Sequence, residues 1–330
     1  MINVKHCHMI KVRKGGIHMK TLNYTLIDVF TTKPFGGNQL AVFEEKDNLT
    51  PDLMQTIARE LNLSETVFIR KASDPNKNKN LRIFTPQVEL HMAGHPTIGA
   101  AYVMAENGMI ETNIGLNDWI FEEGVGDVPV TVEMLDSGIS KVEMEQPLPS
   151  FGDEYTEREL AANLLSLSLE DLDPTFPIQT VSSGVPFLYI PVRTLSAMKK
   201  ISFRTDVWEK YFSEDPNTKH IFTFATETEE PQSTVHSRMF APAMGISEDP
   251  ATGAASGPLG AYLVKHGVVP SETSGIHTIR SEQGLEMGRP SFIDITIIKE
   301  GDAIQKVKIG GKSLIIGSGQ IYLSNTIEKQ

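Results

Sequence analysis

The chain contains 330 residues, 40% hydrophobic and 22% charged, and 42 Asp and Glu outnumber 30 Lys and Arg to give a formal net charge of −12. This length and composition are typical of a globular protein with two domains. The negative charge repels nucleic-acid backbones and anionic lipids, so we expect no nucleic-acid or membrane partner. The only cysteine, Cys7, excludes an internal disulfide and any site that needs two thiols of one chain.

The sequence has no apolar run of about 18 residues, the length that a membrane-spanning helix needs, and we expect a cytoplasmic protein. Residues 1–18 are basic but lack the apolar core of a secretory signal, and we expect them to form a disordered leader. The leader carries four potential metal ligands, His6, Cys7, His8 and His18. Because a terminal segment without periodicity offers no rigid frame, we expect no metal site.

Short strands around two helices are predicted for the first half of the chain. Thr50-Pro51-Asp52 has the residues of a helix start, and the apolar spacing that follows predicts a helix from about 51 to 62. A second helix is predicted to open at His95-Pro96 and to end at Asn107-Gly108. Strands are predicted at about 22–29, 40–43, 66–70, 81–84, 118–122, 128–134 and 140–145.

The second half of the chain repeats features of the first. The repeated pairs are 82–86 (RIFTP) with 238–242 (RMFAP), 101–104 (AYVM) with 261–264 (AYLV), 123–124 (EG) with 283–284 (QG), and 141–144 (KVEM) with 306–309 (KVKI). A nearly constant offset over four separate segments predicts two homologous domains. We assign them to residues 19–148 and 149–330, with a last strand that could return to the first domain, and expect an α+β fold with the site in the cleft between them.

Loops of small residues precede the long helix of each half, at 92–99 and 248–257. If the halves are related by a pseudo-two-fold axis, both helix starts point at the same place. Each offers unpaired N–H groups and the positive end of a helix dipole, which suit a carboxylate or a developing enolate. The alternative is that the small residues only let two helices pack closely.

Three titratable residues flank these features. Glu65 is predicted at a helix-to-strand junction among apolar neighbours, where a carboxyl could transfer protons or merely cap the next strand. His95 lies at a helix start, where the dipole favours neutral imidazole, or it simply caps the helix. Asp249 precedes a proline, as turn-forming aspartates commonly do. The position equivalent to Glu65 in the second half falls near His220 and not on another carboxylate.

Other catalytic motifs fail on their spacing. His91 and His95 are four residues apart, but Gly94 and Pro96 argue against the helix that a metal pair would need. The serine in 253–257 is one place late for a nucleophile elbow, and neither 306–313 nor 124–126 completes a nucleotide-binding loop. We therefore expect no cofactor.

A set of motifs in the chain resembles the phenazine-biosynthesis PhzF-like family. The motifs are 28–30 (DVF), 34–38 (PFGGN), 62–66 (NLSET), 94–97 (GHPT), 248–253 (EDPATG), 283–284 (QG) and 287–291 (MGRPS). They occur in order between about Met19 and Leu323, and together they are specific to the family. The resemblance implies the diaminopimelate epimerase-like fold, with two pseudo-symmetric domains that each wrap a curved, mostly antiparallel sheet around a central helix. It also implies a homodimer.

The resemblance also implies a cofactor-independent isomerase that acts on a small carboxylate-bearing metabolite, of the trans-2,3-dihydro-3-hydroxyanthranilate isomerase type. The residue matching Glu65 carries the proton, while those matching His95 and Asp249 bind and orient the substrate. The helix starts hold its carboxylate. Substrate contacts are expected at Asn38, Ser64, Gly94, Thr97, Thr252, Gly253 and Ala254.

Two alternatives remain open on this fold. Related epimerases place one cysteine at each helix start, and neither 90–99 nor 248–257 contains one. A thiol-independent epimerase could use Glu65 with Asp249 or His95 on opposite faces of the substrate. A binding protein that kept the cleft without the chemistry is the second alternative.

Overall fold

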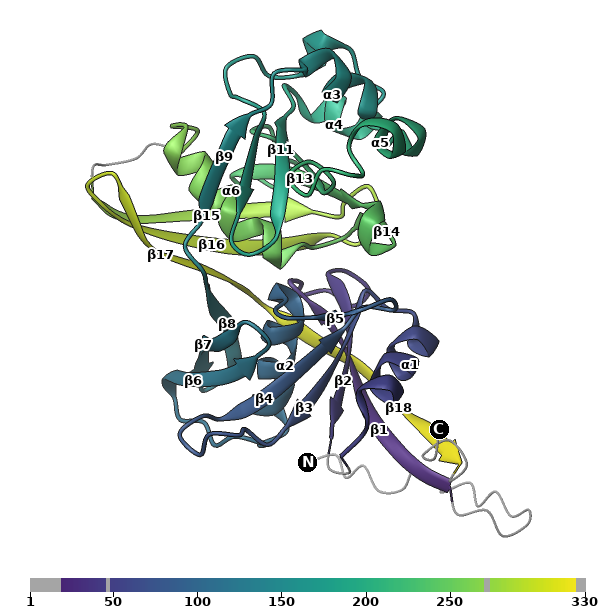
Figure 1. Cartoon of the computed structure of the whole chain (residues 1–330). Helices are drawn as coiled ribbons and strands as arrows, with labels where there is room; N and C mark the ends of the chain where they lie inside the picture. Colours follow the sequence, from purple (N-terminus) through teal and green to yellow (C-terminus); the bar gives the residue numbers. More distant parts are fainter. Residues whose placement is uncertain (1–18, 46–47, 270–273, 325–330) are drawn as a thin grey trace.

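The computed structural model describes residues 19–45, 48–269 and 274–324 and shows two stacked halves (Figure 1). The leader of residues 1–18, with His6, Cys7, His8 and His18, lies outside the described residues. No helix in the described ranges is long and apolar enough to cross a membrane.

The first half contains the helices and strands predicted for it, with ends that differ by a few residues. Its elements are β1 (Met19–Val29), β2 (Asn38–Glu44), α1 (Pro51–Leu61), β3 (Glu65–Arg70), β4 (Lys79–Phe84), β5 (Glu89–Leu90), α2 (Gly94–Glu106), β6 (Gly115–Glu123), β7 (Gly126–Leu135) and β8 (Gly138–Gln146). Pro96 was expected to be the first residue of its helix, but α2 begins two residues earlier, at Gly94.

The second half adds three short helices on its outer surface. Its elements are β9 (Ser150–Glu154), α3 (Arg158–Leu164), β10 (Gln179–Ser182), β11 (Pro186–Pro191), α4 (Leu195–Lys200), α5 (Thr205–Tyr211), β12 (Ile221–Ala225), β13 (Val235–Ala241), β14 (Ile246–Asp249), α6 (Gly253–Lys265), β15 (Gly275–Gln283), β16 (Ser291–Glu300), β17 (Ala303–Gly311) and β18 (Ser313–Ser324). Helices α3, α4 and α5 cover a separate apolar cluster that includes Leu164, Met198 and Phe212.

Strand pairing follows the same order in both halves. Strands β1, β2, β3, β4, β6, β7 and β8 pair successively, as do β10, β11, β12, β13, β15, β16 and β17. The parallel pairs also correspond: β2 with β3 and β4 with β6 in the first half, β11 with β12 and β13 with β15 in the second. This shared topology confirms the two pseudo-symmetric domains.

Each half wraps its curved sheet around one helix, α2 in the first and α6 in the second (Figure 1). Both helices are apolar on nearly every side, which is the pattern of a helix enclosed by protein. Their buried residues belong to one continuous core that runs through both halves. The two helix starts are therefore held in fixed positions by the sheets around them.

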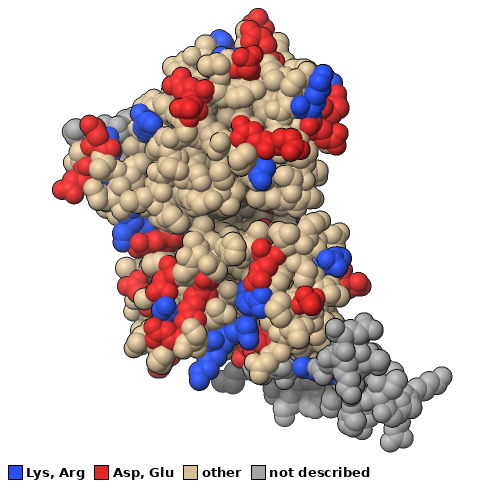
Figure 2. All heavy atoms as spheres, viewed as in Figure 1, with Lys and Arg blue, Asp and Glu red and all other residues tan. Residues whose placement is uncertain are grey.

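Two connections join the halves. Strand β8 of the first half pairs antiparallel with β17 of the second, so that one sheet continues across the boundary. After β17 the chain crosses back to the first half. There β18 pairs with β1 along its whole length, from Met19 opposite Ser324 to Val29 opposite Ser313. Acidic side chains are spread over both halves in Figure 2, in keeping with the net charge of −12.

Candidate active site

Four polar side chains from the two halves meet where α2 and α6 begin. Asn38 and Glu65 are the first residues of β2 and β3, His95 is the second residue of α2, and Asp249 is the last residue of β14. All four are buried, with Glu65 8%, His95 4% and Asp249 5% exposed and Asn38 fully enclosed. The first half supplies three of them and the second half one.

Local sequence explains why Glu65 begins a strand at this place. Thr50 caps the start of α1, where its side chain accepts a hydrogen bond from the Leu53 N–H, and Asn62 ends the helix in a left-handed conformation with φ of 50°. The chain then enters β3, which runs parallel to β2 with Leu40 opposite Glu65. The parallel pairing brings the first residues of both strands to the same edge of the sheet.

The two helix starts touch at a pair of glycines. A Cβ added to Gly94 would lie 2.6 Å from the Cα of Gly253, and one added to Gly253 would lie 2.8 Å from the Cα of Gly94. No other residue allows this approach without a shift of the backbone. The positive ends of both helix dipoles therefore lie next to each other.

Glu65 and His95 form a buried ion pair in this region. Glu65 Oε2 lies 3.0 Å from His95 Nε2. Neither atom meets the geometry of a hydrogen bond with any described residue. A buried carboxylate oxygen and a buried imidazole nitrogen thus face each other with bonding capacity left for a ligand.

The protonation of His95 corrects one expectation from the sequence. Burial lowers the pKa of His95, but the charge of Glu65, 3.0 Å away, together with that of Asp249 outweighs this effect and raises the pKa above its usual value. The helix dipole was expected to favour neutral imidazole. The charges of two nearby carboxylates shift the pKa of His95 upwards, opposite to the expected effect of the helix dipole.

The Asn38 amide links His95 to the second half. Its nitrogen lies 2.9 Å from Asp249 Oδ1 and 3.0 Å from the Ala251 carbonyl oxygen, and 3.3 Å from His95 Nδ1. The amide has two protons, which the two oxygens accept. The Asn38 amide therefore connects Asp249 and Ala251 of the second half with the His95 side of the first.

Asp249 is enclosed by donors. Oδ1 accepts from Asn38, and Oδ2 accepts from the Thr252 hydroxyl at 2.6 Å. Burial and the nearby charge of Glu65 raise the pKa of Asp249 well above its usual range, although His95, Thr252 and Asn38 oppose the shift. The site therefore contains two carboxyl groups and one imidazole, which compete for protons.

Gln283 holds the loop that carries Asp249 and Thr252. Its Oε1 accepts from the Thr252 N–H at 3.2 Å, and its Nε2 donates to the Asp249 carbonyl oxygen at 2.7 Å and to the Thr252 hydroxyl at 3.0 Å. Sequence reasoning noted Gln283 within a repeated motif but did not place it in the site. The signal that could have drawn attention to Gln283 was its position in the repeat, where it corresponds to Glu123 of the first half.

The remaining predicted contacts fall in different places. The Thr97 hydroxyl is enclosed by protein, 2.7 Å from the Ala93 carbonyl oxygen and 2.5 Å from Glu123 Oε1. Ser64 is half-buried directly before Glu65, and Ala254 is half-buried as the second residue of α6. Of these three, Thr97 supports the start of α2 from within the core.

Gln146 was missed because it lies just beyond the strand predicted at about 140–145, where the sequence gives no sign of a role in the site. Its side-chain nitrogen donates to the Gly253 carbonyl oxygen at 3.0 Å, from the last residue of β8 to the first turn of α6. A contact between segments so far apart in the chain has no local signal in the sequence.

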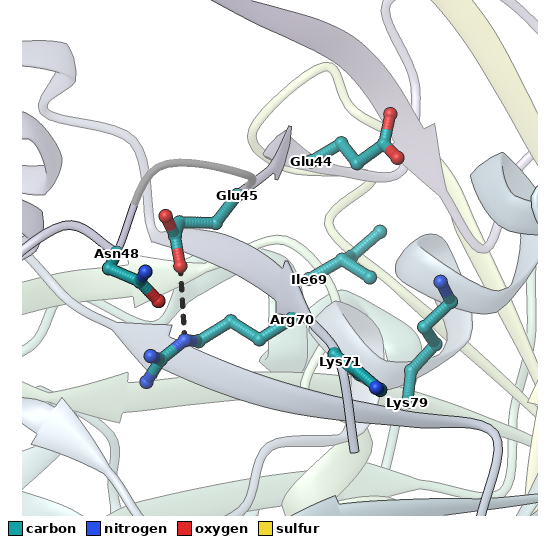
Figure 3. Close-up of a pocket in the computed structure, with 7 residues that line it drawn as sticks. All are labelled: Glu44, Glu45, Asn48, Ile69, Arg70, Lys71 and Lys79. Atoms are coloured by element: carbon teal, nitrogen blue, oxygen red, sulfur yellow. Dashed lines mark hydrogen bonds and ion pairs between the residues drawn. The ribbon is translucent and has the colours of Figure 1, made fainter.

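A surface pocket of about 370 Å³ lies at the opposite end of the same strands (Figure 3). Its walls come from the ends of β2 and β3, and it contains the ion pair between Arg70 and Glu45 at 3.1 Å. Its lining residues are Glu44, Glu45, Asn48, Ile69, Arg70, Lys71 and Lys79. It shares no residue with the candidate site. Across the described residues, no group of three or more His, Cys, Asp or Glu side chains is arranged to hold a metal ion.

Comparisons with known proteins agree with this architecture. The family model of phenazine biosynthesis-like proteins (PhzC-PhzF) matches residues 27–319. An uncharacterized isomerase of Clostridium acetobutylicum is 34% identical, with 93% of this chain and 100% of the relative covered. The trans-2,3-dihydro-3-hydroxyanthranilate isomerase of Pseudomonas aeruginosa is 32% identical, over 91% of this chain and 99% of the relative.

A solved structure gives the same result for the fold. The PhzF-family phenazine biosynthesis protein of Bacillus anthracis superposes with a TM-score of 0.83 at 28% identity, over 92% of this chain and 99% of that chain. Both relatives are named isomerases and match nearly the whole length of this chain, which defines it as an isomerase. The chain belongs to the PhzF family of phenazine biosynthesis-like proteins, as its motifs suggested.

Proposed function

We propose that the protein is a cofactor-independent isomerase that moves a proton between two carbons of a small carboxylate-bearing metabolite. Glu65 serves as both base and acid. The observation that supports this most directly is the buried pair of Glu65 Oε2 and His95 Nε2, 3.0 Å apart and without a hydrogen bond to described residues. Proton transfer between carbons needs a positioned carboxyl group and stabilisation of the charge left behind.

The reaction needs two steps at one face of the substrate. The Glu65 carboxylate removes a proton from carbon, and the electron pair delocalises over the adjacent unsaturated system. The helix starts at Gly94 and Gly253 stabilise this charge and hold the substrate carboxylate. Glu65, now an acid, returns the proton to a different carbon of the same system. No proton is gained or lost overall.

His95 and Asp249 orient the substrate in this scheme. The His95 ring lies 3.0 Å from the Glu65 carboxyl group and fixes its orientation beside the substrate. Asp249 accepts hydrogen bonds from Asn38 and Thr252, which fix its carboxyl group for contact with a polar group of the substrate. Asn38, Thr252, Gly253 and Ala254 complete the contacts that we assign to the bound molecule.

The test uses trans-2,3-dihydro-3-hydroxyanthranilate, the compound in the name of the Pseudomonas relative. The purified protein and this probe are mixed in deuterium oxide and followed by NMR. We expect an allylic shift of the double bond, with deuterium incorporated unless Glu65 is shielded from solvent during transfer.

Each remaining outcome identifies an alternative. Inversion at a stereocentre, with the double bond unmoved, would show an epimerase that uses a second group such as Asp249. A thermal shift on binding without any change in the compound would show a binding protein. If this probe is inert, cyclic and amino-acid carboxylates are screened by thermal shift and the hits are tested in the same way.

A further inference from the structure

A loop of the second half, residues 284–290 between β15 and β16, packs against a loop of the first half, residues 30–37 between β1 and β2. The Gly37 N–H donates to the Pro290 carbonyl oxygen at 3.1 Å, and the Phe292 N–H donates to the Phe30 carbonyl oxygen at 2.8 Å. The two halves are therefore bonded to each other through backbone groups at this junction.

Arg289 makes the polar side-chain contacts across the same junction. Its Nε donates to the Gly37 carbonyl oxygen at 2.8 Å, and its Nη2 donates to Asp28 Oδ1 and to the Gly36 carbonyl oxygen, both at 2.7 Å. Asp28 is fully buried, and its other oxygen accepts from the Phe35 N–H at 2.7 Å. One guanidinium thus binds three acceptors of the other half, which a lysine ammonium cannot match in geometry.

Each of the two loops joined by Arg289 is adjacent in sequence to a residue of the candidate site. Gly37 is followed directly by Asn38, which donates to Asp249. Gln283, which holds the Asp249 loop, directly precedes residue 284. A Cβ at Gly284 would lie 2.6 Å from the carbonyl oxygens of Arg289 and Pro250, so this loop is closely packed on the Asp249 segment.

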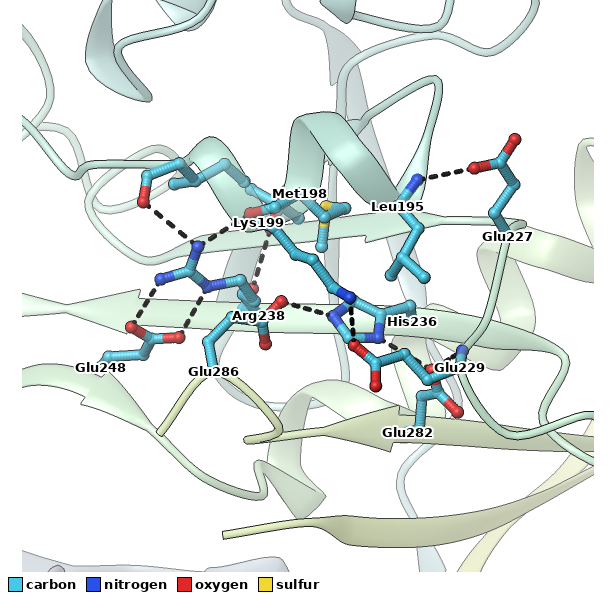
Figure 4. Close-up of polar contacts among 12 residues, drawn as sticks. Leu195, Met198, Lys199, Glu227, Glu229, His236, Arg238, Glu248, Glu282 and Glu286 are labelled. Atoms are coloured by element: carbon cyan, nitrogen blue, oxygen red, sulfur yellow. Dashed lines mark hydrogen bonds and ion pairs between the residues drawn. The ribbon is translucent and has the colours of Figure 1, made fainter. Parts of the chain in front are cut away.

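The loop is also fixed to its own half by a charged histidine (Figure 4). His236 of β13 contacts Glu286 of the loop at 2.9 Å and Glu282 of β15 at 2.8 Å. Burial lowers the pKa of His236, but the two glutamates raise it to about 9, so the imidazolium persists at neutral pH. Removal of the Arg289 side chain would therefore take three hydrogen bonds from the junction, while the two backbone bonds across it and the attachment of the loop to β13 remain.

We propose that Arg289 is a positioning residue for the proton-transfer reaction, which sets the placement of Asn38 in one half relative to Asp249 in the other. It acts through Gly36, Gly37 and Asp28 and does not touch the substrate. The proposal rests on the proposed function, because it assigns Arg289 to that reaction.

The kinetic test compares Arg289→Ala and Arg289→Lys with the wild-type chain, on the NMR assay with trans-2,3-dihydro-3-hydroxyanthranilate. A misplacement of about 1 Å costs about 10²-fold in turnover, which we expect for the alanine variant, with an intermediate loss for lysine. Added guanidinium ion should restore part of the activity of Arg289→Ala. Arg280→Ala is the matched control, because Arg280 pairs with Asp294 at 2.8 Å within one half; it should stay close to wild type.

The second measurement does not depend on turnover. Spin labels at Glu60→Cys in α1 and Glu209→Cys in α5, both exposed, report the distance between the halves on a Cys7→Ser background. We expect Arg289→Ala, and not Arg280→Ala, to shift or broaden the distance distribution. Wild-type turnover in Arg289→Ala would overturn the proposal, as would lost turnover with an unchanged distance distribution.

These two measurements separate the two claims. If the wild-type chain fails to convert any compound, the proposed function fails, and a positioning role in that reaction fails with it even where the distances change. If the wild-type chain turns over and Arg289→Ala behaves like the Arg280→Ala control, only the positioning role is overturned. Because Arg289→Lys keeps the charge, it tests the proposal even where the alanine variant does not fold.

Discussion

At the scale of residues, each long helix begins beside a threonine whose hydroxyl contacts a buried Glu or Gln side chain, Glu123 in the first half and Gln283 in the second. The Thr97 hydroxyl has one proton and lies close to two oxygens, the Ala93 carbonyl and Glu123 Oε1. Since a carbonyl can only accept, a second favourable contact requires Glu123 to be a neutral acid that donates to Thr97. Gln283 donates to Thr252 in the same manner in the other half. Glu123 in its protonated form thus matches the amide at the repeat-related position.

We predict that Glu123→Gln stabilises the protein at alkaline pH. Burial raises the pKa of Glu123 from 4.5 to about 8, although Thr97 and the Ala93 backbone oppose the shift. Below the lower value both the folded and unfolded states hold the proton. Between the two values only the unfolded state ionises, so the free energy of unfolding falls by about 1.4 kcal/mol per pH unit as pH rises. Above about pH 8 both states are ionised, so the free energy of unfolding falls no further through Glu123.

Urea denaturation at pH 5 and pH 8 measures this effect. The stability advantage of Glu123→Gln over wild type should be small at pH 5 and larger at pH 8. The control is Glu111→Gln, at an exposed carboxylate, which should give the same difference from wild type at both values. If the stability difference between Glu123→Gln and wild type were the same at pH 5 and pH 8, Glu123 would not be held in its neutral form by the fold.

Sequence could predict part of the site at this scale. Glu65, His95 and Asp249 stood out because they flank helix starts and a strand start, and they lie together in the structure. Their roles stay a prediction. The upward shift of the pKa of His95 could not be predicted, because it depends on carboxylates brought in from two other segments. Arg289 was visible only as part of a motif, since its three acceptors lie far away in the chain.

At the scale of elements, the helix starts depend on glycines that have no room for a side chain. We predict that Gly94→Ala destabilises the protein by about 1–3 kcal/mol, the usual cost of overpacking, and lowers turnover because it separates α2 from α6. Gly317→Ala in β18 is the control: nothing lies within 4 Å of the added carbon there. It should change stability by less than about 0.5 kcal/mol.

Thermal unfolding and the isomerase assay measure these two variants together. If Gly94→Ala were as stable and as active as Gly317→Ala, close contact of the helix starts would not matter to the protein. The helices and strands of the first half were readily predicted, because apolar periodicity and caps are local signals. The short helices α3, α4 and α5 of the second half were not predicted, and they cover an apolar cluster of their own.

At the scale of the whole molecule, the first half is completed by the last strand. Strand β18 pairs with all of β1, with Ser324 opposite Met19, so a short turn could join these two ends. We predict that residues 313–324, followed by an Asn-Gly turn and residues 19–148, fold as one unit. Residues 19–148 alone should melt at a lower temperature, because one edge of β1 is left unpaired.

Circular dichroism during heating compares the two fragments. Equal melting temperatures would mean that β18 adds nothing to the first half. The internal repeat allowed the two-domain architecture to be predicted from sequence, because both halves keep the same strand order. The pairing of β18 with the first half was raised only as a possibility. Pairing between segments so far apart in the chain has no local signal in the sequence. The homodimer stays a prediction.

The central claim is that Glu65 carries the proton. Glu65→Gln keeps the size and burial of the side chain but cannot take up a proton, so we predict a loss of at least about 10²-fold in turnover. The most direct measurement is the rate of isomerisation by this variant and by wild type in deuterium oxide, on a substrate confirmed with wild type. Thermal shift with the same substrate should show that the variant still binds. Near-normal turnover by Glu65→Gln would contradict the account.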